Sequence, residues 1–269
     1  MIRPEGRPVW LARARVDGLH SWVAAPTGPA RRRPLAVLVP GLLDHPARHA
    51  GWLAELAGQG LVAVAPSPAF GADEPGFRAR LAQRFLPALD GAVQQTVERI
   101  GGVIRACCGF RGADGSRVVL IGVSAGGWAA LRAALEAPGV VAVACVLSGP
   151  GWERPPAEVE PALRAELGTG GLSLEHEQPF EQDRYPGLHA EAVLERAGSL
   201  AGRALLLVQG GQDSWVPAEP SRRLYERLHG MGPEKPERVQ LVVYPGLGHR
   251  LTAPMQQRVT SWVSWMLAS

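Results

Sequence analysis

Three residues of the chain could together carry out nucleophilic catalysis. Ser124 lies in the segment Gly122-Val123-Ser124-Ala125-Gly126, and Asp213 and His249 follow it along the chain. A serine hydroxyl attacks a carbonyl carbon when a histidine accepts its proton and a carboxylate orients that histidine. The order Ser, Asp, His is the one expected when the serine occupies a strand-to-helix turn. We therefore predict that Ser124 is the nucleophile, His249 the general base and Asp213 the orienting acid.

The residues around Ser124 predict such a turn. The apolar run Val118–Ile121 precedes the motif and is typical of a buried strand, while the run from Trp128 to Leu131 is typical of a helix. Small residues beside the serine let strand and helix approach closely, and the turn presents the hydroxyl above the sheet. The backbone N–H of Ala125 then lies at a helix N-terminus, where it can donate to a developing oxyanion.

Asp213 and His249 each follow a predicted strand, at residues 204–208 and 239–243. The carboxyl ends of parallel strands share one edge of a sheet, so we expect both side chains near Ser124. Glu181 and Asp183 stay open as alternative acids. No carboxylate directly follows the predicted strand at residues 140–147, where Ser148-Gly149-Pro150 stands.

The elements needed to hold these residues follow from the apolar pattern. A hairpin is predicted around Asp17-Gly18, with strands over 8–16 and 19–25. Strands and helices then alternate, which predicts an α/β fold with a mostly parallel sheet and helices on both faces. The remaining strands are expected at 35–39, 62–65, 117–122, 140–147, 204–208 and 238–244, and the helices at 48–59, 77–106, 126–136, 217–228 and 254–267.

The alternation stops between residues 150 and 200, where prolines and glycines are frequent and acidic residues outnumber arginines. We expect this segment to form a small cap over the site, inserted in a single domain that spans residues 1–269. Trp152, Trp215 and Leu43 are candidate walls of the substrate pocket. Trp128 is expected to pack in the core.

These motifs are similar to those of serine hydrolases with the α/β-hydrolase fold. The segments Ser124–Trp128, Asp213–Pro217 and Tyr244–His249 resemble the prolyl-oligopeptidase-like and dienelactone-hydrolase-like branches. The resemblance implies the same three catalytic roles. Dienelactone hydrolases proper carry cysteine where this chain has Ser124, and the propeller domain of prolyl oligopeptidases is not expected here.

The resemblance also implies a second oxyanion donor in the loop after the strand at 35–39. The family commonly carries His-Gly there, whereas this chain has Pro40-Gly41-Leu42-Leu43. The backbone N–H of Leu42 is the candidate, with that of Leu43 as the alternative.

The composition argues against several other classes of function. Lysine occurs once, at Lys235, among 28 Lys and Arg residues, and the net charge is +3, so nucleic-acid binding is not expected. The longest apolar run, Val140–Leu147, is far shorter than the ~18 residues of a membrane span. The N-terminus lacks the apolar stretch of a secretory signal, which predicts a cytoplasmic protein.

No cofactor or metal is expected. The three cysteines lack metal-ligand spacing. His45 and His49 are four residues apart but have no third ligand nearby, so a surface pair at a helix start is predicted for them.

Together these features predict a carboxylesterase-like serine hydrolase that forms an acyl-enzyme with a small to medium neutral ester. Two alternatives stay open. One is an aminopeptidase-like or acyl-peptide-cleaving hydrolase, in which Glu175, Glu177 or Glu181 would bind an amine. The other is a catalytically silent binding protein with the same fold. Homo-oligomerisation also stays open.

Overall fold

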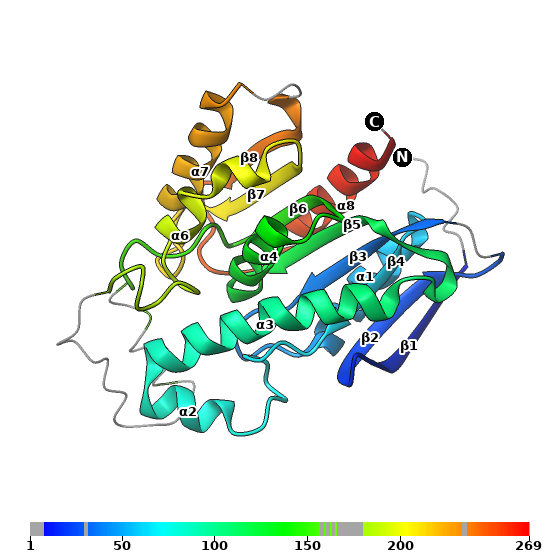
Figure 1. The fold of residues 1–269 in the computed structure, drawn as a ribbon, viewed down its shortest axis with the longest axis horizontal. Helices are drawn as coiled ribbons and strands as arrows, with labels where there is room; N and C mark the ends of the chain where they lie inside the picture. Colours follow the sequence, from blue (N-terminus) through cyan, green and yellow to red (C-terminus); the bar gives the residue numbers. More distant parts are fainter. Residues whose placement is uncertain are drawn as a thin grey trace.

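The structure is a computed structural model that describes residues 8–29, 32–156, 180–232 and 236–268, together with residues 159, 162 and 165. Its centre is an eight-stranded sheet in the order β1-β2-β4-β3-β5-β6-β7-β8 (Figure 1). The first two strands form an antiparallel hairpin, β2 pairs antiparallel with β4, and the pairs from β4 to β8 are parallel. The strands are β1 (Val9–Val16), β2 (Leu19–Pro26), β3 (Arg33–Val39), β4 (Val62–Pro66), β5 (Ala113–Val123), β6 (Val140–Val146), β7 (Ala204–Gly210) and β8 (Val239–Tyr244).

Helices cover both faces of this sheet, and the central strands are apolar on both sides for that reason. In β3, Leu35 and Val37 pack into the cluster on one face, while Ala36 and Leu38 pack into the cluster on the other. Side chains alternate between faces along a strand, so a strand buried on both faces is a continuous apolar run. The predicted α/β fold with a mostly parallel sheet and an antiparallel N-terminal hairpin is thus confirmed.

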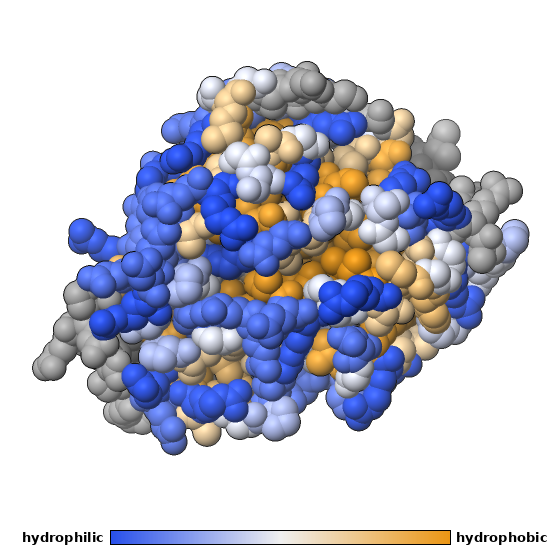
Figure 2. Space-filling view, in the orientation of Figure 1, coloured by the Kyte–Doolittle hydropathy of each residue, from blue (hydrophilic) through white to orange (hydrophobic). Residues whose placement is uncertain are grey.

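The helices divide between the two faces. The first face is the one that carries the larger apolar cluster, and Figure 1 shows α3 and α4 in front of it. The helices that supply side chains to this cluster are α2 (Phe77–Gln83), α3 (Phe85–Cys107), α4 (Ala125–Glu136) and α7 (Glu219–Gly230). On the second face lie α1 (Ala50–Gly58) and α8 (Ala253–Ala268). Polar residues cover much of the first face, with apolar side chains visible between them near its middle (Figure 2).

The single helix predicted over 77–106 is wrong, because the chain breaks between α2 and α3. Arg84 adopts φ −146° and ψ 84°, outside the helical region. Pro87 explains the break, since its ring would clash with the carbonyl group of Gln83 in a continuous helix and it has no N–H to donate to that group. Pro87 is instead accommodated in the first turn of α3.

The segment between β6 and β7 is described only in part. Its described elements are α6 (Glu191–Leu194) and the short helical turn Ala197–Leu200. Arg132 of α4 anchors this segment, because its buried guanidinium donates to the carbonyl oxygens of Pro150, Pro186 and His189 at 2.9–3.0 Å. Most of residues 157–179 lie outside the described ranges, so the cap and the single-domain organisation stay predictions.

Candidate active site

Ser124 occupies a strained turn between β5 and α4. Its backbone has φ 52° and ψ −125°, a region that residues with side chains rarely adopt. Glycines make the turn sterically feasible. A Cβ atom on Gly122 would lie 2.4 Å from the carbonyl oxygen of Gly126, and one on Gly126 would lie 2.2 Å from that of Val39. The turn therefore requires both glycines of the sequence motif.

The structure brings Ser124, His249 and Asp213 into one hydrogen-bonded chain. The distance from Ser124 Oγ to His249 Nε2 is 2.9 Å, and that from His249 Nδ1 to Asp213 Oδ2 is 2.7 Å. The Asp213 side chain is fully buried, and its Oδ1 accepts hydrogen bonds from the backbone N–H groups of Trp215 and Val216 at 3.0 and 2.9 Å. Both oxygens of the carboxylate are thus engaged, which fixes its orientation toward His249.

Adjacent parallel strands explain why two residues distant in sequence meet here. Asp213 follows β7 and His249 follows β8, and these strands pair from Leu205–Val239 to Gly210–Tyr244. The loops after them also bond to each other, since the N–H of Gln212 donates to the carbonyl oxygen of Leu247 at 2.9 Å. Gly210 permits this contact, because a Cβ atom there would lie 2.5 Å from the same carbonyl oxygen.

This arrangement can activate a serine hydroxyl. Because Asp213 is an acceptor, it holds the tautomer of His249 that carries hydrogen on Nδ1, and Nε2 is left with a lone pair that faces Ser124 Oγ. The imidazole can then accept the serine proton, while the carboxylate stabilises the imidazolium that forms.

The predicted oxyanion donors are the backbone N–H groups of Leu42 and Ala125, two residues that line the cavity at Ser124. Ala125 is the first residue of α4, where N–H groups have no partner within the helix. Leu42 lies in the loop after β3 and lines the same cavity as Ser124 and Ala125. Within the described ranges, no protein acceptor takes the Leu42 N–H. Leu43 differs, because its N–H donates to the carbonyl oxygen of Phe70 at 2.8 Å. Leu42 and Ala125 therefore stay the predicted oxyanion donors.

A cavity of about 240 Å³ opens at Ser124 and His249. The predicted pocket residues Leu43, Trp152 and Trp215 all line it. Trp128 is buried, as expected for a core residue, and also reaches the cavity wall. Sequence reasoning did not identify several further lining residues, which are mostly apolar: Asp44, Arg48, Leu89, Val159, Val216 and Leu251.

The partly buried Asp44 and the buried His49 form a pair beside the loop after β3. Their side chains are joined by a 2.8 Å contact between Asp44 Oδ2 and His49 Nε2, and the N–H of His45 donates to Asp44 Oδ1 at 2.7 Å. Burial acts to raise the pKa of Asp44, but these hydrogen bonds and the charges nearby outweigh it and hold the pKa below its usual value. The prediction of a surface pair is wrong for His49, which is only 2% exposed because it packs against the Trp52 ring and bonds to Asp44.

The alternative acids lie elsewhere. Glu181 and Asp183 are exposed, and neither contacts His249, whose Nδ1 bonds to Asp213. Glu175 and Glu177, proposed as amine ligands, lie outside the described residues. In the described part of the chain, no three His, Cys, Asp or Glu side chains are arranged to bind a metal ion. None of the described helices combines the length and apolarity needed to cross a bilayer.

Comparison with known proteins agrees with this geometry. The sequence profile of the prolyl oligopeptidase family, Peptidase_S9, matches residues 103–268, a stretch that contains Ser124, Asp213 and His249. The chain belongs to the prolyl oligopeptidase family. This is a family of serine hydrolases, and membership implies a catalytic triad of the kind that Ser124, His249 and Asp213 form.

Individual relatives are distant. A Bacillus subtilis (strain 168) protein named "Putative esterase YitV" is 23% identical over 149 residues, which cover 55% of this chain and 57% of that protein. The match thus spans little more than half of that relative's length.

Solved structures share the fold. TT1662 from Thermus thermophilus has a TM-score of 0.74 at 18% identity, covering 97% of this chain and 99% of that one. The acylaminoacyl peptidase of Pyrococcus horikoshii has a TM-score of 0.68 at 17% identity, covering 98% of this chain and 41% of that one. These similarities show that the chain has the α/β-hydrolase fold.

Proposed function

We propose that this protein is a carboxylic ester hydrolase that acts on small to medium neutral esters through an acyl-enzyme on Ser124. The observation that carries the proposal is the hydrogen-bonded chain Ser124–His249–Asp213, which lies at a small cavity lined mostly by apolar residues. A cavity of about 240 Å³ suits a short acyl or alcohol group.

The reaction proceeds in two halves. In the first, Ser124 Oγ attacks the ester carbonyl carbon while its proton moves to His249 Nε2. The C–O bond to the alcohol then breaks, and the alcohol leaves with the proton from His249. In the second half, His249 takes a proton from water, hydroxide adds to the acyl carbon, and the acid leaves as the proton returns to Ser124. The N–H groups of Leu42 and Ala125 stabilise the oxyanion in both halves.

The charges of the cavity favour an ester over a substrate with a free amine. Among the described residues, Asp44 supplies the carboxylate that lines the cavity at Ser124. The side chain of Asp213 is fully buried and does not line the cavity. The Asp44 oxygens already accept from His45 N–H and contact His49 Nε2, so an ammonium group would have to displace these partners. The described residues therefore support an aminopeptidase-like activity less well than an esterase activity.

The test compares wild type with Ser124→Ala on p-nitrophenyl acetate, butyrate and octanoate and on aminoacyl p-nitroanilides. We expect turnover of the shorter esters that disappears in the variant. Preference for the anilides would assign peptidase activity instead. Equal inactivity of both proteins on every substrate would favour a silent binding protein.

A further inference from the structure

The indole ring of Trp215 lies flat against the imidazole ring of His249. The ring centroids are 5.4 Å apart and the planes are inclined by only 14°, the geometry of an offset stack. Trp215 is also one of the residues that line the cavity at Ser124, so it adjoins both the proposed base and the space for substrate.

His249 needs such a contact because of where it lies. It belongs to the irregular stretch between the end of β8 at Tyr244 and the start of α8 at Ala253. The bonds from its ring to Asp213 and Ser124 fix its two nitrogens but leave the ring free to tilt about the line that joins them. A flat side chain stacked on the ring limits that tilt.

Trp215 is itself held in place by hydrogen bonds to its backbone N–H and to its carbonyl oxygen. Its N–H donates to Asp213 Oδ1 at 3.0 Å, and its carbonyl oxygen accepts from Trp152 Nε1 at 2.8 Å. Trp152 is anchored in turn, because its backbone N–H and carbonyl group bond to Leu188 and Ala190, each at 2.8 Å. A continuous path of contacts thus runs from the segment between β6 and β7 to the imidazole.

We propose that Trp215 is a positioning residue for His249 and that Trp152 holds Trp215 in place. The proposal rests on the proposed function, since it assigns these residues to the same reaction. A small displacement of a catalytic group has large kinetic effects, because the proton transfer requires hydrogen-bond distance and alignment.

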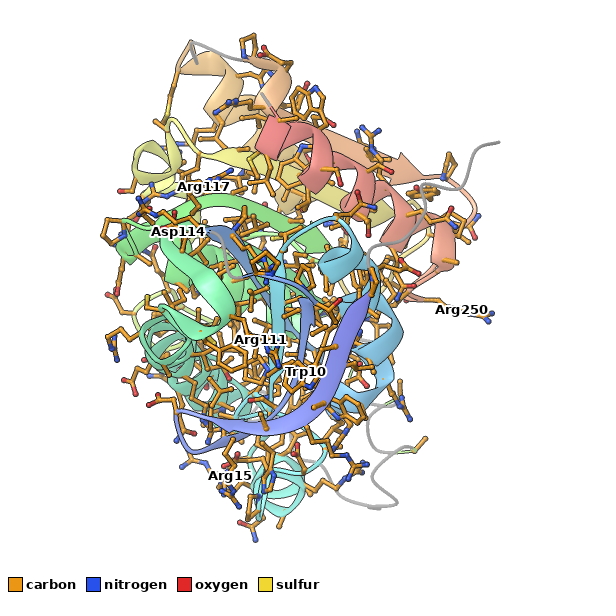
Figure 3. The ribbon with its side chains drawn as sticks, turned by 90° about the vertical axis from the view of Figure 1, so that its right-hand side faces the viewer. Trp10, Arg15, Arg111, Asp114, Arg117 and Arg250 are labelled. Atoms are coloured by element: carbon orange, nitrogen blue, oxygen red, sulfur yellow. The ribbon has the colours of Figure 1, made fainter. Side chains whose placement is uncertain are left out.

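The experiment measures kcat and KM for p-nitrophenyl acetate and butyrate with Trp215→Leu, Trp215→Phe, Trp152→Phe and Ser124→Ala. Trp10→Leu is the control. Trp10 lies on β1 against Arg111, well apart from Arg250, the neighbour of His249 (Figure 3). Circular dichroism and thermal unfolding check that each variant folds.

Removing the flat ring in Trp215→Leu is expected to lower kcat by about 10- to 100-fold, by the same factor for both esters and with little change in KM. Trp215→Phe keeps a flat ring and should retain most of the activity. Trp152→Phe removes one hydrogen-bond donor and should lower kcat by about 2- to 10-fold. Trp10→Leu should match wild type.

Two results would overturn the proposal. One is an unchanged kcat with a raised KM in Trp215→Leu, which would make Trp215 only a wall of the pocket. If that variant does not fold, an unchanged kcat in Trp152→Phe decides against the proposal, and a lowered kcat with unchanged KM supports it. Failure of the proposed function is distinguishable, because Ser124→Ala would then remain as active as wild type.

Discussion

The backbone N–H of Leu43 donates to the carbonyl oxygen of Phe70 at 2.8 Å, while the N–H of its neighbour Leu42 has no acceptor among the described residues. Leu43 has φ 55°, so the peptide chain turns sharply at this point. In the loop after β3, the N–H of Leu43 thus holds the turn through its hydrogen bond, while Leu42, whose N–H is not used in this way, lines the cavity at Ser124.

The Leu42 amide is expected to stabilise the oxyanion. Leu42→Pro removes this donor, whereas Leu42→Ala keeps it. We predict that Leu42→Pro lowers kcat by about 10²- to 10³-fold relative to Leu42→Ala, the usual effect of losing one oxyanion donor. Steady-state kinetics with p-nitrophenyl butyrate measures this difference, provided that circular dichroism shows both variants folded. Equal kcat values would remove Leu42 from the oxyanion site.

Asp213 is expected to act by holding one tautomer of His249. Asp213→Asn can donate a hydrogen to Nδ1 and so favour the tautomer with its hydrogen on Nε2, which cannot accept the proton of Ser124. We predict a fall in kcat of about 10³- to 10⁴-fold. The exposed alternative acid provides the matched control, and Asp183→Asn should keep the wild-type kcat. The opposite pattern would transfer the role of acid to Asp183.

The nucleophile turn should tolerate no side chain at Gly126. A Cβ atom there would lie 2.2 Å from the carbonyl oxygen of Val39 and 2.5 Å from that of Pro40. We predict that Gly126→Ala lowers the free energy of unfolding by about 1–3 kcal/mol, as overpacking does elsewhere.

The control is Gly91→Ala in α3, where an added Cβ atom would meet nothing within 4 Å. That change should raise stability by about 0.5–1 kcal/mol, because glycine is unfavourable inside a helix. Urea unfolding measures both effects. A Gly126→Ala protein as stable as Gly91→Ala would show that the turn is looser than described.

Asp44 makes the stability of the loop after β3 depend on pH. Its pKa in the folded chain lies below the usual 3.8, since its hydrogen bonds to His49 and His45 outweigh its burial. The ionised Asp44 carboxylate therefore contributes its full stability above pH 3.8, and this contribution is lost as the pH falls through the folded-state pKa of Asp44.

Asp44→Asn should be less stable than wild type at neutral pH, and the difference should shrink as the pH falls below 3.8. Urea unfolding from neutral pH to below pH 3.8 measures the difference in free energy of unfolding between the two proteins, with Glu181→Gln, a change at an exposed residue, as the control. A difference that does not change with pH would contradict the assigned interaction.

Local patterns were sufficient to predict the sheet and the Ser124 turn. Apolar runs such as residues 35–39 show where strands are buried, and small residues around Ser124 show where a strand must meet a helix. The meeting of Asp213 and His249 could also be predicted, because residues that follow adjacent parallel strands lie at one edge of the sheet.

Long-range contacts account for what the sequence did not reveal. Arg132 lies in an apolar helix, and the carbonyl groups that make its burial feasible come from Pro150, Pro186 and His189. Burial lowers the pKa of Arg132 to about 10. His49 is likewise buried through its bond to Asp44. Neither partnership has a local sequence signal, whereas the break before α3 had one in Pro87.

The most direct test of the account is covalent labelling with a fluorophosphonate, followed by mass spectrometry of the intact chain and of its peptides. The wild-type protein should gain a single adduct on Ser124, because the hydroxyl attacks phosphorus, the P–F bond breaks with loss of fluoride, and His249 takes up the serine proton. Ser124→Ala should gain none. Labelling of Ser124→Ala to the same extent, or an adduct on another residue of the wild type, would contradict the assignment of Ser124 as the nucleophile.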